Sequence, residues 1–438
     1  SLCKPAQGMA GQHGAAGGMS MKVLLIAPNI DATDVGEAFV AFKWADALSH
    51  IADVTVLAFQ RLGRPDLAGQ LPNARVVTWP EPAWARKNER LNAMLKPAWP
   101  VFSRHVRVWM RSAIGAGEAF DIAHQLMPQA ARYASPLRHF DIPYIIGPLG
   151  GALDTPEAFR GEAASAPFFT RLRALDRYRF RRDPWLRHSY ERAACILGVA
   201  PYVQEILSDI PLRRFESVLE LGIDDVEPVT PRTTEEGHMR VLHVGRGVRT
   251  KGLRDTVRAM AQLKDLPGVT LTSAGAGEEI EICRAEAQRL GVADRVTFKG
   301  KVSRAEVEQL YASHDVFCFP SFREPAGGVL YEAMRHGLPV IAADRGGPAS
   351  IIDASCGIRI AVTEPTRFAG DISTALRQFA GAPALRTRLG DGARAKVLRE
   401  GLWASKADAL LALYNDILEY PSVPASIQKV SITTPIVS

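Results

Sequence analysis

The feature that most constrains the fold of this chain is an alternation of short apolar runs with longer helical patterns, and it occurs twice. In its first occurrence, the apolar runs have the length and the β-branched composition of buried strands. They are residues 22–28, 53–59, 75–79, 141–147 and 195–200. Strands that alternate with helices imply a parallel sheet that is covered on both faces. The first half of the chain is therefore predicted to form an α/β domain.

The alternation restarts after a polar, proline-bearing stretch at residues 223–238. The strand-like runs of this second series are residues 240–245, 269–275, 295–300, 315–320 and 339–344. A helix from about Gly252 follows the first run, and helical patterns fill the other gaps. We therefore predict an α/β protein with two Rossmann-like, doubly wound parallel-sheet domains.

The domain boundaries follow from these patterns, and a length of 438 residues is sufficient for two such domains. Residues 1–20 are predicted to be a flexible extension, residues 21–222 the first domain and residues 223–401 the second. Residues 402–420 have an apolar face at helical spacing and are predicted to be a C-terminal helix, followed by a loose tail at 421–438.

The net charge of the chain indicates which partners it can bind, and its cysteines indicate the cellular compartment. A formal net charge of +6 and a pI of about 9.1 favour anionic partners, with an ordinary basic surface as the alternative. The five cysteines are scattered and lack metal-ligand spacing, so reduced core residues of a cytoplasmic protein are expected. They are Cys3, Cys195, Cys283, Cys318 and Cys356. No apolar run reaches the roughly 18 residues of a membrane span, and no nucleic acid is expected as a partner because no binding module for it accompanies the charge.

The strongest functional signal lies in residues 321–352. Glu324 precedes Pro325 and should be extended, and Pro325 suits the first position of a helix that ends near Gly337. The N–H groups of the predicted first turn are free to bind an anion, and small side chains there let a ligand approach the backbone. The residues of this turn are Ala326, Gly327 and Gly328.

Two carboxylates of this segment, those of Glu324 and Glu332, are predicted to lie two helical turns apart. At about 1.5 Å per residue they are separated by about 12 Å, which exceeds the roughly 5–9.5 Å of a glycosidase acid/base pair. The spacing suits one long ligand held at both ends. A nucleotide sugar fits, with its sugar near Glu324, its diphosphate over the helix start and its ribose near Glu332. The alternative is an ordinary helix start with surface acids.

A second signal is the segment 244–257, in which a predicted strand ends at Gly245 and two cations flank the following turn. Arg246 and Lys251 are placed where cations and helix-start amides can meet a diphosphate. The spacing is that of neither the dinucleotide fingerprint nor the P-loop. A solvated basic loop is therefore an equal alternative.

Two further loops follow predicted strands of the second domain. The loop 274–279 contains Gly275 and Gly277, and it is either a nucleotide-facing loop or a tight turn. Lys301 and Val302 follow the next strand, at the sheet edge where open α/β sheets bind ligands.

Together these blocks resemble the retaining glycosyltransferases of family four, which have the GT-B fold. The matches are VGR with the following lysine and leucine, the glycine-bearing loop, V-x-F-x-G, and E-P-x-G-x-V-L-Y-E-A-M-x-x-G-x-P-V-I-A, at residues 244–253, 274–278, 296–300 and 324–342. The resemblance implies two domains that face a cleft, with the acceptor on the first domain and the donor nucleotide on the second. It also implies that the helix 402–420 crosses back to the first domain.

The resemblance further implies roles for single residues. Arg246 and Lys251 would bind the donor diphosphate. Glu324 would hold sugar hydroxyls and assist at the reacting face, and Glu332 would hold the ribose hydroxyls. The remaining donor-binding candidates are Gly245, Gly275, Gly277, Lys301, Val302, Ala326, Gly327, Gly328 and Val329.

The first domain matches less of the family pattern. Members often carry two glycines in the first strand–helix loop, whereas this chain has Gly36 alone. His124 lies in a segment similar to the one that holds an active-site histidine, so it is the second catalytic candidate; a hydrogen-bonded histidine at a strand end is the alternative. Gly150 and Gly151 lie in a segment similar to one that lines the acceptor cleft, with a plain glycine turn as the alternative.

Two stretches of the first domain, residues 84–111 and 171–192, are rich in arginine and aromatic residues. Such stretches can lie on an anionic bilayer surface, with arginines on phosphates and aromatic rings at the interface. Ordinary helices with solvated arginines are the alternative.

The predicted function is that of a retaining, hexosyltransferase-like enzyme that moves a sugar from a nucleotide diphosphate donor to a lipid-linked acceptor or a growing glycan, in polysaccharide or glycolipid biosynthesis. No cofactor and no metal are expected, and the expected location is cytoplasmic, with peripheral attachment to the inner face of the plasma membrane. A nucleotide-sugar epimerase on the same fold is the main alternative. A dinucleotide oxidoreductase lacks its fingerprint here, and a non-catalytic sugar-nucleotide sensor would not need this set of charged residues.

Overall fold

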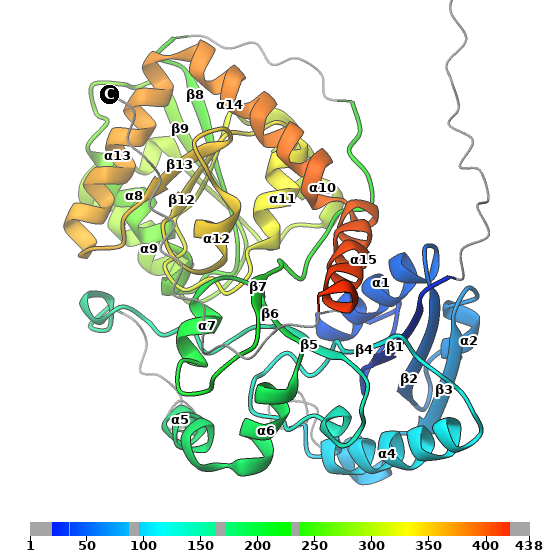
Figure 1. The fold of residues 1–438 in the computed structure, drawn as a ribbon. Helices are drawn as coiled ribbons and strands as arrows, with labels where there is room; N and C mark the ends of the chain where they lie inside the picture. Colours follow the sequence, from blue (N-terminus) through cyan, green and yellow to red (C-terminus); the bar gives the residue numbers. More distant parts are fainter. Residues whose placement is uncertain (1–19, 35, 87–95, 163–171, 229–235, 421–438) are drawn as a thin grey trace, which may run out of the picture.

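The computed structural model describes residues 20–34, 36–86, 96–162, 172–228 and 236–420. Within them the chain forms two α/β bodies, drawn in the lower part and at the upper left of Figure 1. The predicted extension 1–20, apart from its last residue, and the predicted tail 421–438 lie outside the described residues. The predicted pair of Rossmann-like parallel-sheet domains is confirmed.

The first domain is built on a seven-stranded sheet with the order β3-β2-β1-β4-β5-β6-β7, and all its strand pairs are parallel. The strands are β1 Lys22–Ile26, β2 Asp53–Gln60, β3 Arg75–Pro80, β4 Ile122–Gln125, β5 Tyr144–Leu149, β6 Cys195–Gly198 and β7 Phe215–Ser217. The helices are α1 Glu37–Ser49, α2 Leu67–Gln70, α4 Trp99–Gly115, α5 Leu172–Arg182, α6 Pro184–Arg192 and α7 Tyr202–Ile206, with short 3₁₀ segments η1 Ala83–Arg86, η2 Pro136–His139 and η3 Glu157–Phe159.

The second domain has a six-stranded parallel sheet with the order β10-β9-β8-β11-β12-β13. The strands are β8 Met239–Val244, β9 Val269–Ala274, β10 Val296–Gly300, β11 Val316–Phe319, β12 Val340–Ala343 and β13 Gly357–Ile360. The helices are α8 Leu253–Ala261, α9 Glu279–Leu290, α10 Arg304–Ser313, α11 Gly328–Arg335, α12 Gly346–Ile351, α13 Pro365–Gly381 and α14 Pro383–Lys396, with the 3₁₀ segments η5 Arg249–Lys251 and η6 Ala293–Arg295 and the π-helical turn η7 Val397–Gly401.

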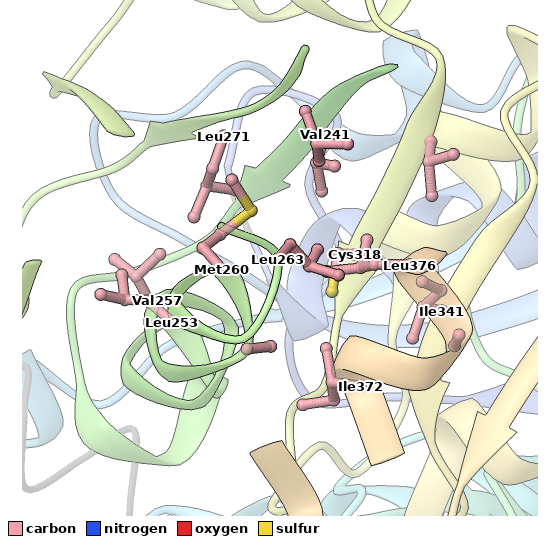
Figure 2. Packing of buried hydrophobic residues seen from close by; sticks show 14 of the residues in the cluster. Val241, Leu253, Val257, Met260, Leu263, Leu271, Cys318, Ile341, Ile372 and Leu376 are labelled. Atoms are coloured by element: carbon pink, nitrogen blue, oxygen red, sulfur yellow. The ribbon is translucent and has the colours of Figure 1, made fainter. Parts of the chain in front are cut away.

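Each sheet is covered on both faces by apolar side chains of helices. Figure 2 shows one such layer in the second domain, where Val241 and Leu271 of the sheet face Val257 and Met260 of α8 and Ile372 of α13. Burial on both faces explains why the strands appear in the sequence as continuous apolar runs rather than as alternating patterns. Four of the five predicted core cysteines are buried and free, and Cys3 lies outside the described residues.

Two passages of the chain between the domains lie side by side. The segment after β7 leads into the second domain, and α15 (Trp403–Glu419) returns to the first. Ile223 pairs with Leu402 in an isolated parallel bridge, and the rings of Trp44 in α1 and Trp403 lie 5.5 Å apart. Residues of α15 such as Tyr414 belong to the core of the first domain. In the described part of the chain, no helix combines the length and apolarity needed to cross a membrane.

Candidate active site

Two neighbouring strands of the second sheet end in loops that meet. The strand β8 is followed by η5, which ends with Lys251, and its neighbour β11 is followed by the loop that carries Glu324. The ammonium group of Lys251 donates a hydrogen bond to the carboxylate of Glu324 in a direct ion pair, and 13% and 14% of the two side chains remain exposed. The ring of Phe319 lies 5.5 Å from the same ammonium group. The fold therefore joins two of the residues predicted for the site.

The loop around Glu324 differs from the prediction in one respect. The helix α11 begins at Gly328, so Pro325 precedes the helix rather than occupying its first position. Two features explain the difference: Gly327 has a φ of 93°, and the carbonyl of Glu324 accepts a hydrogen bond from the N–H of Gly347 at 2.9 Å. The chain is thus held in a turn for three residues longer than the proline predicts.

The beginning of α11 still offers backbone N–H groups to a ligand. Gly328 and Val329 lie in its first turn, where N–H groups have no partner within the helix and the helix dipole favours a negative charge. A Cβ atom at Gly328 would lie 2.4 Å from Cδ1 of Leu221, so the segment that follows β7 packs directly against the start of α11. Ala326 is buried just before the helix. The helix start therefore lies at the boundary between the two domains.

Glu332 lies one turn further along α11 and is half-buried. Burial raises the pKa of its carboxyl group, although a hydrogen bond from the hydroxyl of Tyr311, at 3.2 Å, acts in the opposite direction. A carboxylate with remaining acceptor capacity at this position can accept hydrogen bonds from the hydroxyls of a ligand.

The two glycine-bearing loops of the second domain pack backbone against backbone. The N–H of Gly245 donates to the carbonyl of Ala274 at 3.0 Å. A Cβ atom at Gly275 would lie 1.8 Å from the carbonyl oxygen of Gly245, and one at Gly277 would lie 2.2 Å from that of Gly247. These positions admit no side chain, so packing of the loops is sufficient to explain their glycines. The neighbouring loop tip presents Arg246 to solvent.

Lys301 and Val302 follow β10, on the side of β9 that lies away from β8. Lys301 is exposed and Val302 is half-buried. The N–H of Gly275 donates to the carbonyl of Gly300 at 2.8 Å, which links this loop to the glycine-bearing loop. The two candidates thus share the sheet edge of Lys251, two strands away from it.

The candidates on the acceptor side lie at the corresponding edge of the first sheet. Gly36 caps the beginning of α1 with a φ of 66°. The N–H of Gly150 donates to the carbonyl of Gln129 at 3.0 Å, and the carbonyl of Gly151 accepts from the hydroxyl of Tyr202 at 3.0 Å. The latter two glycines therefore belong to a fixed turn that follows β5.

His124 of β4 has no exposed surface, and both of its ring nitrogens have partners within the protein. Nε2 lies 2.7 Å from the carbonyl oxygen of Gly147, and Nδ1 lies 2.6 Å from the hydroxyl of Tyr414 in α15. A carbonyl only accepts, so Nε2 carries the proton and Nδ1 accepts from the tyrosine. Burial lowers the pKa of His124 to about 4 and keeps the ring neutral. This is the environment of a hydrogen-bonded core histidine, the alternative to the catalytic role.

Sequence reasoning missed Glu220, which lies in the first passage between the domains. Burial, and then the charges of Glu37 and Glu324, raise the pKa of Glu220 to about 8. Its carboxylate accepts a hydrogen bond from the side chain of Gln129, and its carbonyl accepts from the indole of Trp44 at 3.0 Å. The charge of Glu324 is thus one cause of the raised pKa of Glu220. The sequence offers one signal for Glu220: it is an acidic residue between two leucines, just before the polar linker.

The arrangement can hold an anionic ligand that also carries hydroxyl groups. A cation, a carboxylate and the N–H groups of a helix start lie together at the domain boundary, with a second carboxylate along α11. In the described ranges, no three histidine, cysteine, aspartate or glutamate side chains gather into a group that could hold a metal ion.

Comparison with known proteins extends this description. Residues 231–396 match the family model for glycosyl transferases group 1. A D-inositol 3-phosphate glycosyltransferase of Segniliparus rotundus is 34% identical over 207 residues, which are 45% of this chain and 42% of that protein. The lipopolysaccharide core biosynthesis glycosyltransferase LpsE of Rhizobium meliloti is 30% identical over 237 residues, 52% of this chain and 66% of that protein. The chain thus spans about half the length of the curated relatives it matches.

Solved structures extend the likeness to both domains. The sucrose-phosphate synthase of Thermosynechococcus elongatus superimposes with a TM-score of 0.61 at 19% identity, covering 91% of this chain and 99% of that one. HepE of Anabaena, solved in complex with UDP, superimposes with a TM-score of 0.59 at 18% identity, covering 90% of this chain and 100% of that one. The chain therefore has the two-domain GT-B fold, and its residues 231–396 match the glycosyl transferases group 1 model.

Proposed function

We propose that this protein is a retaining glycosyltransferase of family four, which moves a sugar, of hexosyl type, from a nucleotide diphosphate donor to an acceptor. The observation that carries the proposal is the ion pair of Lys251 and Glu324 beside the start of α11. The group 1 match of residues 231–396 and the names of the relatives support transfer of a sugar. Retention rests on the resemblance of residues 324–342 to the family motif.

In this scheme the donor diphosphate binds between the start of α11 and the turn of η5. Cleavage of the bond between the anomeric carbon and the diphosphate moves negative charge onto the leaving group. Lys251, Arg246 and the first N–H groups of α11 stabilise that charge, and groups that are already in position lower the barrier without reorganisation. A diphosphate on Lys251 competes with Glu324 for the ammonium group, so donor binding frees the Glu324 carboxylate to accept hydrogen bonds from the sugar.

The two ends of the donor are assigned to the two carboxylates. Glu324 accepts from the sugar hydroxyls, and Glu332 accepts from the ribose. HepE shares the fold and was solved in complex with UDP, which makes uridine diphosphate the first donor nucleotide to test. Acceptor and donor bind to opposite domains, so closure precedes transfer.

The experiment is calorimetric titration with UDP and with a panel of nucleotide sugars, followed by turnover with the donor that binds. Lys251→Ala should weaken UDP binding by about 10- to 100-fold, because it removes a charge-assisted contact to phosphate. Glu332→Ala should weaken it by about tenfold through the ribose. Lys264→Ala, at an exposed position, is the matched control and should bind like the wild type. Undiminished affinity and turnover in both site variants would show that the site is assigned wrongly.

We further propose that the acceptor is lipid-linked or a growing glycan. With such an acceptor, the enzyme would act at the inner face of the plasma membrane. Figure 1 shows α4, α5 and α6 along the lower edge of the first domain. Within them Val108, Tyr178 and Trp185 are 59%, 62% and 70% exposed among arginines. Exposed apolar side chains next to cations suit an anionic bilayer surface. Parts of the two basic stretches, at 87–95 and at 171, lie outside the described residues.

Vesicle flotation tests the membrane assignment. The full chain should float with vesicles of phosphatidylglycerol and stay behind with vesicles of phosphatidylcholine, and about 0.5 M salt should release it because salt screens exposed charges. Trp185→Ala should reduce the floating fraction. If the chain floats with neither lipid, the proposed membrane association is wrong, and the proposed donor chemistry is unaffected.

A further inference from the structure

A segment of the first domain leaves its own sheet and ends inside the second domain. We call residues 150–162, which follow β5, the strap. At its end Phe159 has no exposed surface and belongs to the core of the second domain. Its ring lies 4.3 Å from that of Phe322 and 5.7 Å from that of Phe368, measured between ring centroids. The strap is therefore anchored by apolar burial on the far side of the domain boundary.

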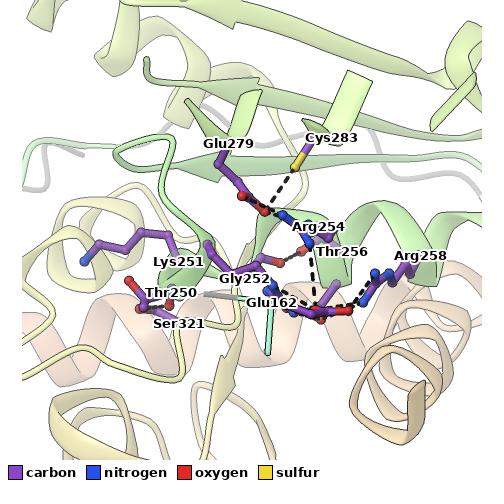
Figure 3. A network of polar contacts seen from close by, with 12 residues as sticks. Glu162, Thr250, Lys251, Gly252, Arg254, Thr256, Arg258, Glu279, Cys283 and Ser321 are labelled. Atoms are coloured by element: carbon purple, nitrogen blue, oxygen red, sulfur yellow. Dashed lines mark hydrogen bonds and ion pairs between the residues drawn. The ribbon is translucent and has the colours of Figure 1, made fainter. Parts of the chain in front are cut away.

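The last described residue of the strap, Glu162, enters a cluster of arginines of the second domain (Figure 3). Its Oε2 accepts from Nε and Nη2 of Arg249 at 3.0 and 2.6 Å, and its Oε1 lies 2.9 Å from Nη2 of Arg258. Burial raises the pKa of Glu162, but hydrogen bonds from Arg258 and Arg249 outweigh burial and leave the pKa below its usual value. The carboxylate is therefore charged in this position at neutral pH.

The charge of Glu162 completes the cluster. Among the described residues, ion pairs connect four arginines with three carboxylates of the second domain, so this part of the cluster has one positive charge in excess. The members are Arg249, Arg254, Arg258, Arg289, Asp255, Glu279 and Glu286. Arg249 and Asp255 are 5% and 0% exposed, and in such surroundings an uncompensated charge is costly. Glu162 brings the cluster to neutrality.

The strap also contacts the two segments that carry the ion pair of the site. Arg249 is the first residue of η5, and Lys251 is its last. On the other segment, Nε of Arg323, next to Glu324, donates to the carbonyl of Leu153 in the strap at 3.0 Å. Figure 3 shows Lys251, on the turn of η5, with Glu162 on the other side of that turn.

The turn that braces Glu324 is attached to the strap as well. Arg345, just before α12, donates through Nη1 to the carbonyl of Asp154 in the strap at 2.7 Å and to that of Phe322 at 2.8 Å. Gly347, two residues later, donates its N–H to Glu324. Each element that holds the ion pair in place is thus attached to the same segment of the first domain.

We propose that Glu162 and Phe159 are positioning residues: they dock the strap on the second domain and thereby align Lys251 and Glu324 with the donor. This inference rests on the proposed function. It makes the donor side dependent on a segment that begins at the glycine turn of the acceptor side, Gly150–Gly151. Detachment of the strap would disturb the turn of η5 and the loop of Glu324 without removing any residue that touches the donor.

The test compares two glutamates of the same cluster. Glu162→Gln keeps the size of the side chain and removes the charge on the strap. Glu286→Gln removes a carboxylate that pairs with Arg258 and Arg289 within the second domain and does not touch the strap. We expect Glu162→Gln to lower kcat/KM for the donor sugar by about tenfold and to raise the UDP Kd several-fold, because small displacements of positioned groups are costly in rate. Glu286→Gln should match the wild type within about twofold.

Hydrogen exchange provides a readout that does not depend on activity. In Glu162→Gln, the amides of residues 157–162, 249–252 and 321–324 should exchange faster together, whereas Glu286→Gln should affect only its own surroundings. Equal kinetics and equal exchange in the two variants would overturn the proposal and leave Glu162 as an ordinary salt-bridge partner. If Glu162→Gln does not fold, Phe159→Leu serves as the second strap variant under the same criteria. A wild-type chain that binds no nucleotide sugar contradicts the proposed function instead, while the exchange data still decide the positioning role.

Discussion

Ionisable side chains near the strand ends differ between the two domains in their exposure and in their hydrogen-bond partners. After β8 and β11, Lys251 and Glu324 keep 13% and 14% of their side chains exposed and are bound to each other. At β4, His124 has no exposed surface, and each ring nitrogen already has a partner. A partly exposed ion pair can exchange one partner for a ligand, whereas a fully buried ring must both become accessible and give up an existing hydrogen bond to do so. We therefore propose that the donor chemistry belongs to the second domain and that His124 has a structural role.

The largest effect should come from removing the charge of Glu324. Glu324→Gln should lower kcat with the bound donor sugar by about 10³-fold, since loss of one positioned electrostatic contact to the reacting groups has that size. Glu281→Gln, at a side chain that is 77% exposed on α9, is the control with the same chemical change. Steady-state turnover of both variants measures the effect. A Glu324→Gln enzyme with nearly wild-type kcat would remove this carboxylate from the chemistry.

His124→Ala provides the opposite case. Loss of a buried ring and its two hydrogen bonds should lower the free energy of unfolding by about 3 kcal/mol, measured by urea unfolding. The kcat of the folded fraction should change by less than about threefold. Tyr414→Phe, which removes only the hydroxyl bound to Nδ1, should cost about 1 kcal/mol. A stable His124→Ala variant with strongly reduced kcat would instead identify a catalytic histidine and abolish the contrast between the domains.

The sequence predicts those parts of the molecule that are determined locally. Strands buried on both faces form uninterrupted apolar runs, and most of them were predicted within a few residues. The prediction does not contain the strands β4, β7 and β13. They have only four, three and four residues and contain polar or glycine positions. The segment of Glu324 was recognised because its proline, glycines and acids are neighbours in the chain. Even there, the start of α11 was placed three residues early because the turn depends on a hydrogen bond from Gly347.

Contacts between distant segments had no such signal. His124 and Tyr414 are 290 positions apart, and Glu162 and Arg249 are 87 apart. Nothing near His124 in the chain indicates that a helix from the other end supplies its second hydrogen bond. Likewise, Glu162 follows a glycine in a polar stretch that is typical of a loop. Whether a polar group is satisfied inside the protein or available to a ligand depends on such contacts, so the sequence could nominate His124 but could not assign its role.

The pH dependence of stability sharpens the same contrast. Burial lowers the pKa of His124 to about 4, against about 6.5 in the unfolded chain. Above pH 6.5 the ring is neutral in both states, and its contribution to stability is complete. Between pH 6.5 and 4 only the unfolded state takes up the proton, so the wild type should lose up to about 3 kcal/mol from this group. Urea unfolding at several pH values should show a shallower dependence in His124→Asn, and parallel curves would contradict the lowered pKa.

The smallest predicted effect concerns the glycines of the donor edge. Gly275→Ala places a Cβ atom 1.8 Å from the carbonyl oxygen of Gly245, at a φ of 139°, so the loops must separate. We expect a loss of about 2 kcal/mol in the free energy of unfolding, the size of a local steric conflict. The UDP Kd should rise as well, because Arg246 lies on the displaced loop. Gly291→Ala, at the end of α9 with a φ of 70°, would meet only Nζ of Lys264 at an ordinary 3.9 Å. It should cost about 1 kcal/mol and leave the Kd unchanged. An unchanged Kd in Gly275→Ala would show that the glycine-bearing loops only pack against each other and do not contribute to donor binding. Donor binding would then be confined to Lys251, Glu324 and α11.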